Sequence, residues 1–235
     1  MEKIKLSIII PVYNEEKTLE GIIDKVQQVD FKEISKELII VNDGSKDKTE
    51  KIIVKLKSKY RNIKSFKHPY NRGKGAALRT GFKHASGNII TIQDGDLEYD
   101  PNEFKKMIRL ILEGRTEVVY GSRLLRRTKG FWISSHYYGN KLLSFITKLL
   151  YLRRISDMET CYKMMSYEVL NELSLCSNGF NIEPEITAKI IRKGHNIIEV
   201  PIKYTGRSFK EGKKINWKHG IQAIWTLFYW KFREF

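Results

Sequence analysis

The first half of the sequence alternates short apolar runs with segments of helical periodicity, and this alternation limits the folds open to the chain. The apolar runs read as strands at residues 5–12, 37–42, 62–67, 88–93 and 117–121. Between them, apolar residues recur at the spacing of one helix face, as in Leu19, Ile22, Ile23 and Val26. The pattern predicts an α/β fold with a mostly parallel central sheet and helices on both faces. In such sheets ligands bind at the carboxyl ends of the strands, so the residues after each run are the candidates for a site.

The charge balance narrows the class of partner. The 235 residues are most simply one domain, and 43 Lys and Arg against 27 Asp and Glu leave a net charge of +16. This excess predicts an anionic partner, which can be nucleic acid, the phosphates of a nucleotide sugar or an anionic lipid surface. We expect no nucleic acid, because the chain has no helix-turn-helix, zinc-finger or RNA-binding signature.

Two further features bear on the compartment. Cys161 and Cys176 have no metal-ligand spacing and make no disulfide framework, which favours a reducing, cytoplasmic environment. No signal peptide is expected, and no uncharged run reaches the roughly 18 apolar residues that a membrane-spanning helix needs.

An acidic loop follows the predicted strand 88–93. Asp94 and Asp96 flank Gly95, and Glu98 comes two residues later, before Pro101 opens a helical pattern. Carboxylate oxygens in this arrangement suit Mg²⁺ or Mn²⁺ shared with a diphosphate. The alternative is a solvated acidic turn before a helix, where aspartate is favoured without any ligand.

Polar residues also follow the other predicted strands. Pro11 marks the end of the first strand, so Tyr13 and Glu15 would lie at the carboxyl edge of the sheet. There the ring of Tyr13 could stack on a base, and the carboxylate of Glu15 could accept a hydrogen bond from a ribose or a base. Asp43 ends the second strand and could accept from the same groups. Helix capping and turn formation explain these residues equally well.

Three basic segments are candidate anion sites. Gly73 and Gly75 would let the backbone approach a ligand closely, while Lys74 and the following helix N-terminus would attract an anion. After the fifth strand come three arginines that could clamp a phosphate or form a solvated basic loop, namely Arg123, Arg126 and Arg127. A further cationic loop spans residues 206–214.

The second half carries two segments rich in aromatic residues and leucine, at 131–152 and 217–233, each flanked by Lys or Arg. Such segments are typical of helices that lie in a membrane interface. They are equally typical of a core helix, or of a helix that docks on the domain or on a partner subunit.

Together the motifs resemble those of a known enzyme family. In order along the chain they are PVYNEE, IIVNDGSKDKT, NRGKGAALRTG, QDGDLEYDP, YGSR, DMETCYKM and NIEPEITAKIIRKGHNIIEVPIKYTGR. The chain resembles the family 2 glycosyltransferases over residues 5–232, and among them the polyprenyl-phosphate glycosyltransferases of the dolichol-phosphate mannose synthase type. The resemblance implies a single GT-A domain over residues 1–235, with a nucleotide-sugar-binding half (1–122) and an acceptor and membrane-interface half (123–235).

The resemblance also assigns roles by position. It implies donor-nucleotide contacts at Pro11, Tyr13, Glu15, Val41, Asp43 and Lys74. Asp94 and Asp96 would hold the metal and diphosphate, with Glu98 as a third metal ligand and Gly95 where alanine is usual, a missing methyl expected to matter little. Arg123 would orient the donor and acceptor phosphates together with Arg126 or Arg127, and a loop with Arg207 and Lys213 would close over the nucleotide.

The implied reaction is an inverting transfer of a hexose from a UDP- or GDP-linked sugar to a dolichyl or undecaprenyl phosphate, with Mg²⁺ or Mn²⁺ as cofactor and Asp96, Arg123 and Arg126 as catalytic residues. A lipid phosphate is already ionised, so no dedicated base is expected. The alternative is transfer to a sugar hydroxyl in polysaccharide or glycolipid assembly, which needs a base such as Asp157, Glu183 or Glu185. We expect a cytoplasmic protein, peripheral on the cytoplasmic face of the membrane, held by its own surface, by a membrane-protein partner or as a homo-oligomer.

Overall fold

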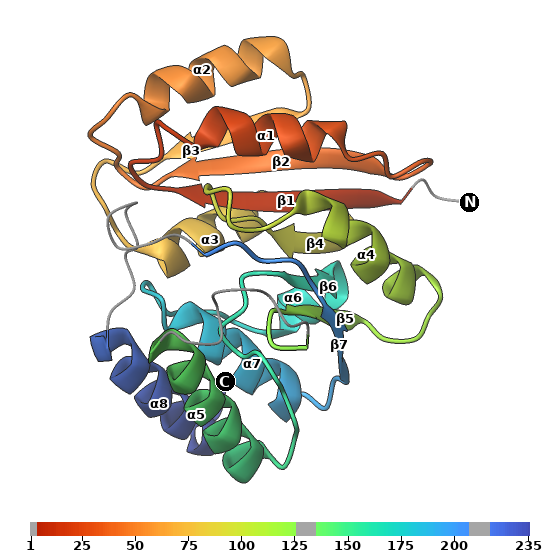
Figure 1. Cartoon of the computed structure of the whole chain (residues 1–235), viewed down its shortest axis with the longest axis vertical. Helices are drawn as coiled ribbons and strands as arrows, with labels where there is room; N and C mark the ends of the chain where they lie inside the picture. Colours follow the sequence, from red (N-terminus) through yellow and green to blue (C-terminus); the bar gives the residue numbers. More distant parts are fainter. Residues whose placement is uncertain (1–3, 126–134, 207–216) are drawn as a thin grey trace.

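The computed structural model describes residues 4–125, 135–206 and 217–235. In this part of the chain one seven-stranded sheet has the order β3-β2-β1-β4-β6-β5-β7 (Figure 1). The strands are β1 Lys5–Val12, β2 Ser35–Asn42, β3 Ile63–Lys67, β4 Ile89–Ile92, β5 Val118–Ser122, β6 Lys163–Ser166 and β7 Ile197–Pro201. β6 runs antiparallel to both of its neighbours, and the other pairings are parallel. The predicted mostly parallel α/β sheet is confirmed.

The helices fill the connections between the strands. They are α1 Leu19–Gln28, α2 Thr49–Lys59, α3 Lys74–Lys83, α4 Phe104–Leu112, α5 Ser135–Tyr151, α6 Tyr167–Glu172, α7 Ile182–Arg192 and α8 Trp217–Phe232, with a short 3-10 helix, η1, at Pro101–Glu103. β1 to β3 step outward across the sheet and the chain then returns to β4, so right-handed crossovers put α1 and α2 on one face and α3 on the other (Figure 1).

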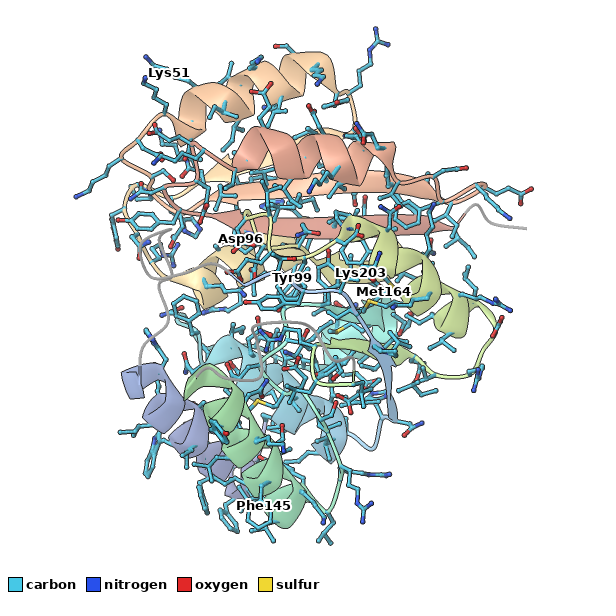
Figure 2. All side chains as sticks on the ribbon, in the orientation of Figure 1. Lys51, Asp96, Tyr99, Phe145, Met164 and Lys203 are labelled. Carbon is cyan, nitrogen blue, oxygen red and sulfur yellow. The ribbon has the colours of Figure 1, made fainter. Side chains whose placement is uncertain are left out.

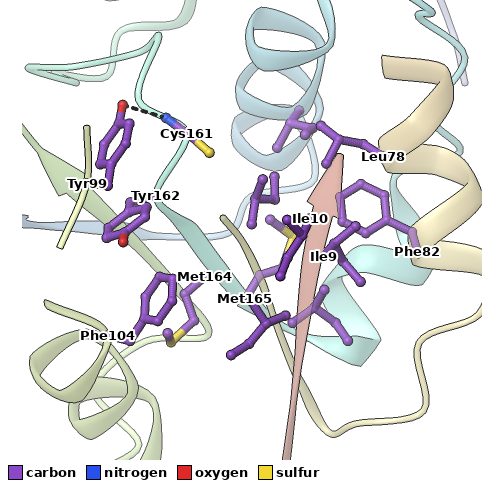
Figure 3. Close-up of a cluster of buried hydrophobic side chains, with 14 of the residues drawn as sticks. Ile9, Ile10, Leu78, Phe82, Tyr99, Phe104, Cys161, Tyr162, Met164 and Met165 are labelled. Atoms are coloured by element: carbon purple, nitrogen blue, oxygen red, sulfur yellow. Dashed lines mark hydrogen bonds between the residues drawn. The ribbon is translucent and has the colours of Figure 1, made fainter. Parts of the chain in front are cut away.

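The core forms because the central strands are apolar on both faces. In β1 the side chains of Ile8, Ile9 and Ile10 are fully buried, as expected for a parallel strand covered by helices on both sides. Figure 3 shows Ile9 beside Leu78 and Phe82 of α3, while Tyr99, Phe104 and Tyr162 pack together in another part of the same cluster. The rings of Tyr99 and Tyr162 stack with their centroids 4.5 Å apart.

Two strands were missing from the sequence prediction. β6 has only four residues, begins with a buried lysine and contains no β-branched residue, so neither its period nor its composition indicates a strand. β7 carries Glu199 at its centre and ends at Pro201. Pairing with β4 and β5 stabilises β6 in spite of its weak propensity, because its two methionines are buried between neighbours.

The two aromatic segments form α5 and α8, which lie side by side at one end of the molecule (Figure 1). Tyr151 at the end of α5 donates to the carbonyl oxygen of Leu227 in α8 over 2.6 Å. Each helix buries one face, which includes Leu143 of α5 and Trp230 of α8, and exposes another that is also apolar. Packing of α5 and α8 against the protein is therefore confirmed, and contact of their exposed faces with a membrane stays a prediction.

Candidate active site

The ends of the strands bring the candidate residues to one edge of the sheet. Glu15 follows β1, Asp43 follows β2, Asp94 follows β4 and Arg123 follows β5, all at the carboxyl ends of parallel strands. Because β6 is antiparallel, its first residue, Lys163, lies at this same edge. Asp96 occupies the middle of the molecule, between the ends marked by Lys51 and Phe145 in Figure 2.

Lys74 joins the acidic loop to the second half of the chain. Its Nζ lies 2.8 Å from Asp94 Oδ1 and 3.1 Å from Glu183 Oε1. Glu183 in turn binds the fully buried Lys163, with 2.6 Å between Oε2 and Nζ. Burial alone would raise the pKa of Asp94, but the adjacent ammonium of Lys74 outweighs burial and lowers it. The result is an alternating chain of charges, Asp94–Lys74–Glu183–Lys163, at the base of the site.

The other two acidic residues of the loop have partners of their own. Asp96 is largely buried, and its Oδ1 accepts from the backbone N–H of Glu98 at 3.1 Å. Glu98 Oε2 accepts from the hydroxyl of Tyr204 at 2.7 Å. The loop is therefore pinned to the segment after β7, where Tyr99 and Tyr204 also form an isolated bridge.

The acidic loop offers the right donor atoms for a hard divalent cation, since all three side chains present carboxylate oxygens. Within residues 4–125, 135–206 and 217–235, however, no three His, Cys, Asp or Glu side chains converge into a ready-made metal cluster. Asp94, Asp96 and Glu98 as metal ligands remain a prediction, and one carboxylate oxygen of Glu98 already accepts a hydrogen bond from Tyr204.

The donor-side residues lie on the first two strands. Pro11 and Val41 are register partners in β1 and β2, and Val41 is fully buried. Asp43 is also buried: its carboxylate accepts from the backbone N–H groups of Arg72 and Gly73 and lies 2.7 Å from His68 Nδ1. Asp43 thus shapes the loop before α3 from within the protein.

Two further donor-side candidates, Tyr13 and Glu15, lie in the turn after β1. Glu15 is buried, with Oε2 accepting from the hydroxyl of Thr18 at 2.7 Å. The backbone N–H of Glu15 donates to Thr49 Oγ1 at 2.9 Å, which ties this turn to the start of α2. Contact of Tyr13, Glu15 and Asp43 with a nucleotide stays a prediction.

The two glycines at the start of α3, Gly73 as the N-cap and Gly75 in the first turn, pack against another part of the chain. A Cβ on Gly73 would come within 2.4 Å of the carbonyl oxygen of Asn178, and one on Gly75 within 2.4 Å of that of Ser177. Gly73 also has a φ of +97°, which side chains disfavour. The two glycines therefore accommodate the protein's own 177–179 backbone, and close approach of a ligand at this loop stays a prediction.

Gly95 also corrects an expectation. An added Cβ would lie 2.8 Å from Cγ1 of Val12, closer than two carbons normally approach. Gly95→Ala would therefore require the side chain of Val12 to shift. Val12 occupies the space that the methyl group of an alanine would need.

Arg123 donates three hydrogen bonds to the carboxylate of Asp157. Its Nε and Nη2 donate to the two oxygens of Asp157 at 2.7 Å each, and its backbone N–H donates to Oδ2 at 2.9 Å. Burial opposes the charge of both groups, but their mutual attraction outweighs it, raising the pKa of Arg123 and lowering that of Asp157. The other predicted basic residues, Arg126, Arg127, Arg207 and Lys213, lie outside the described residues.

The residues suspected as a base are all engaged in ion pairs. Asp157 binds Arg123, Glu183 binds Lys74 and Lys163, and Glu185 lies 2.7 Å from Lys189. Both glutamates lie in the first turn of α7, where no side-chain hydrogen bond caps the helix in the described structure. These carboxylates hold lysine and arginine side chains in place by ion pairing.

The segment before β6 contains a buried carboxyl group, that of Glu159, with an oxygen, Oε1, that lacks a hydrogen bond in the described structure. Burial raises the pKa of Glu159 to about 7, although Lys163 opposes the shift. Its position between Asp157 and Lys163 in the sequence gave no sign of this environment.

Other organising residues had little signal in the sequence. Lys163 lies in the motif DMETCYKM, and the one local sign of its role is that a lysine stands inside an apolar run. Glu199 binds the backbone N–H groups of Ser156 and Asp157 from β7, and Asn140 of α5 donates to Asp157. Such partners come from distant strands and helices, so only the topology reveals them.

Comparison with known proteins identifies the family of this chain. The model of the family described as glycosyl transferase family 2 matches residues 7–174. A dolichol-phosphate mannosyltransferase of Pyrococcus furiosus is 30% identical over 97% of this chain, which spans 64% of that relative's length. A UDP-N-acetylglucosamine–dolichyl-phosphate N-acetylglucosaminyltransferase of Methanococcus voltae is 34% identical over 88% of this chain and 89% of its own.

A solved structure shares the fold. Glucosyl-3-phosphoglycerate synthase from Mycobacterium tuberculosis, crystallised with Mn²⁺, UDP-glucose and phosphoglyceric acid, superposes with a TM-score of 0.71. The match covers 97% of this chain and 80% of that one at 19% identity, so it supports the GT-A type of fold.

Proposed function

Because the chain belongs to glycosyl transferase family 2, we propose that it transfers a hexose from a nucleotide-diphosphate sugar to a polyprenyl phosphate. One observation carries the proposal: a single edge of the sheet holds an acidic loop at 94–98 and an arginine fixed by a buried carboxylate. A donor diphosphate with its cation suits the first, and an acceptor phosphate suits the second. The names of the two relatives, both of which act on dolichol-type phosphates, support this choice of acceptor.

On the donor side, Asp94 and Asp96 would hold Mg²⁺ or Mn²⁺. The cation supplies positive charge to the departing diphosphate. Lys74 is placed to assist, since its ammonium is anchored by Glu183 beside Asp94 and needs little reorganisation. Pro11, Tyr13, Glu15, Val41, Asp43 and Gly95 would line the nucleotide half of the site, with Arg207 and Lys213 closing over it.

On the acceptor side, Arg123 would orient the lipid phosphate, with Arg126 or Arg127 as its second cation. A phosphate oxygen forms the new bond to the anomeric carbon while the bond from that carbon to the diphosphate oxygen breaks, which inverts the configuration. No base is needed, because the lipid phosphate is already ionised. Asp157 contributes by keeping the guanidinium of Arg123 in one orientation.

The exposed faces of α5 and α8 suit a membrane-borne acceptor. Both carry large apolar side chains with the helical spacing i, i+4, i+7 and i+11, namely Tyr138, Leu142, Phe145 and Leu149 on α5, and Ile221, Trp225, Phe228 and Phe232 on α8. We call these two rows the apolar face. Phe145 lies at the end of the molecule, away from Lys51 of α2 (Figure 2).

The charges around the apolar face fit an anionic lipid surface. Neither helix contains an acidic residue, and both contain lysines, while Arg153 and Arg154 follow α5. Each basic residue near such a surface contributes roughly 1 kcal/mol. No helix in the described ranges is long and apolar enough to cross a bilayer. We propose peripheral attachment on the cytoplasmic face through the apolar face.

Vesicle binding tests the attachment. Phe145→Ser and Trp225→Ser should reduce co-sedimentation with vesicles that contain an anionic lipid, because each removes an exposed apolar side chain from the apolar face. Val54→Ser is the matched control, since Val54 is equally exposed but lies on α2. Equal loss of binding in all three variants, or in none, would contradict the assignment.

Transfer assays test the activity. Thermal stabilisation by UDP- and GDP-linked sugars with Mn²⁺ identifies the donor, and transfer of its sugar to polyprenyl phosphate is then measured. Asp96→Asn should abolish transfer, whereas Asp100→Asn should retain it, because Asp100 caps η1 through an oxygen that asparagine keeps. Unchanged turnover by Asp96→Asn would refute the role of the acidic loop.

A further inference from the structure

Helix α5 has a polar contact with the site on the side opposite its exposed residues. Asn140 is buried, and its Nδ2 donates to Asp157 Oδ1 at 2.5 Å. Asp157 holds Arg123, so two successive side-chain contacts connect α5 to the guanidinium.

The amide of Asn140 makes this contact at a cost. Its Oδ1 is buried and has no partner in the part of the chain that the structure describes. A buried amide oxygen without a hydrogen bond destabilises a protein, and an apolar residue would avoid that cost. Stability of the helix therefore does not account for an asparagine here, whereas donation to Asp157 does.

The segment that carries Asp157 is held between α5 and the sheet. On the sheet side, Glu199 of β7 accepts from the backbone N–H groups of Ser156 and Asp157. On the helix side, Ser144 of α5 donates to the carbonyl oxygen of Ser156 at 3.0 Å. On the sheet side β7 is the edge strand and is paired with β5. Of the two elements that hold the segment, α5 is the one with an exposed apolar row.

We propose that Asn140 is a positioning residue that couples lipid contact by α5 to the orientation of Arg123. This inference rests on the proposed function, since it takes α5 as lipid-facing and Arg123 as the acceptor-phosphate ligand. Leu142 and Phe145 belong to the same rigid helix as Asn140, so seating them in a membrane sets the position of the amide that orients Asp157. Lipid contact then completes the acceptor half of the site.

The test separates lipid contact from delivery of the acceptor. Transfer to a short-chain, water-soluble isoprenyl phosphate is measured with and without phosphatidylglycerol vesicles that contain no acceptor. For the unaltered protein we expect the vesicles to raise kcat/KM for this acceptor about tenfold, the effect of one hydrogen bond to a charged group. Asn140→Ala should lose this stimulation while binding the vesicles as before.

Two more variants sharpen the comparison. Thr147→Val is the matched control, because Thr147 lies on the buried side of α5 and its hydroxyl donates within the helix, to the carbonyl oxygen of Leu143. It should keep the stimulation. Asn140→Leu removes the donor without leaving a cavity, so it replaces Asn140→Ala if the alanine variant does not fold.

Each outcome bears on the proposal. Equal stimulation of the Asn140 variants and the unaltered protein overturns the coupling, as does transfer by the unaltered protein without any stimulation. A merely structural role for Asn140 would lower turnover by the same factor with and without vesicles, which also overturns it. Failure of the unaltered protein to use any isoprenyl phosphate instead refutes the proposed function, and the coupling with it.

Discussion

The buried pair of Arg123 and Asp157 gives the sharpest prediction of stability. Asp157 is fully buried and accepts three hydrogen bonds from Arg123 and one from Asn140. Asp157→Asn keeps the shape of the side chain but removes its charge and turns an amide N–H₂ toward these donors. Removal of one partner from a buried ion pair costs about 3–5 kcal/mol, and we expect that loss in the free energy of unfolding.

A double-mutant cycle measures the interaction energy between Arg123 and Asp157. Urea unfolding is compared for the unaltered protein, Asp157→Asn, Arg123→Met and the double variant. Arg123→Met leaves a buried carboxylate without its cation, so it should also be strongly destabilised. The double variant should be more stable than the sum of the two single changes predicts, by about 2 kcal/mol or more, because neither charge is then left alone. Transfer to the lipid phosphate should fall at least about a hundredfold in all three variants, equivalent to about 2.7 kcal/mol. A cost below about 1 kcal/mol for Asp157→Asn, or additive single changes, would refute the reasoning.

Two further predictions concern the acidic loop and the segment before β6. Gly95→Ala should cost about 1–3 kcal/mol in urea unfolding, because its Cβ meets Val12, and combination with Val12→Ala should cost less than the sum of the single changes; additive costs would contradict the contact. Glu159→Gln should flatten the pH dependence of stability. A carboxyl whose pKa rises from 4.5 to about 7 on folding stabilises the protein fully below pH 4.5, and this contribution is lost as the pH rises through 7. The variant should therefore match the unaltered protein near pH 4.5 and exceed it by up to about 3 kcal/mol at pH 8, and parallel pH profiles would contradict this.

Local sequence signals predicted the frame of the fold because most of the first five strands contain a short apolar run that is followed by polar residues. The run at 5–12 matches β1 Lys5–Val12, and the run at 88–93 contains β4 Ile89–Ile92. The same signals placed Asp43, Asp94 and Arg123 at one edge of the sheet, since parallel strands present their carboxyl ends together.

What the sequence could not predict depends on tertiary contacts. β6 is a strand because β4 and β5 flank it, and its first residue, Lys163, reaches the site because it runs antiparallel. The glycines beside Lys74 looked suited to a ligand, but they face the 177–179 backbone, which is about 100 residues away in the sequence. Asn140 and Glu199 reach Asp157 from α5 and β7, and no local pattern links them.

The position of the cation relative to the acidic loop tests the central claim most directly. A crystal of the protein with Mn²⁺ and the nucleoside diphosphate of its donor, measured near the manganese absorption edge, locates the ion by its anomalous scattering. We predict one strong peak beside the bound diphosphate at the acidic loop, where Asp94 and Asp96 would hold the cation. A diphosphate bound with its cation elsewhere, or bound at this loop with no manganese beside it, would contradict the account.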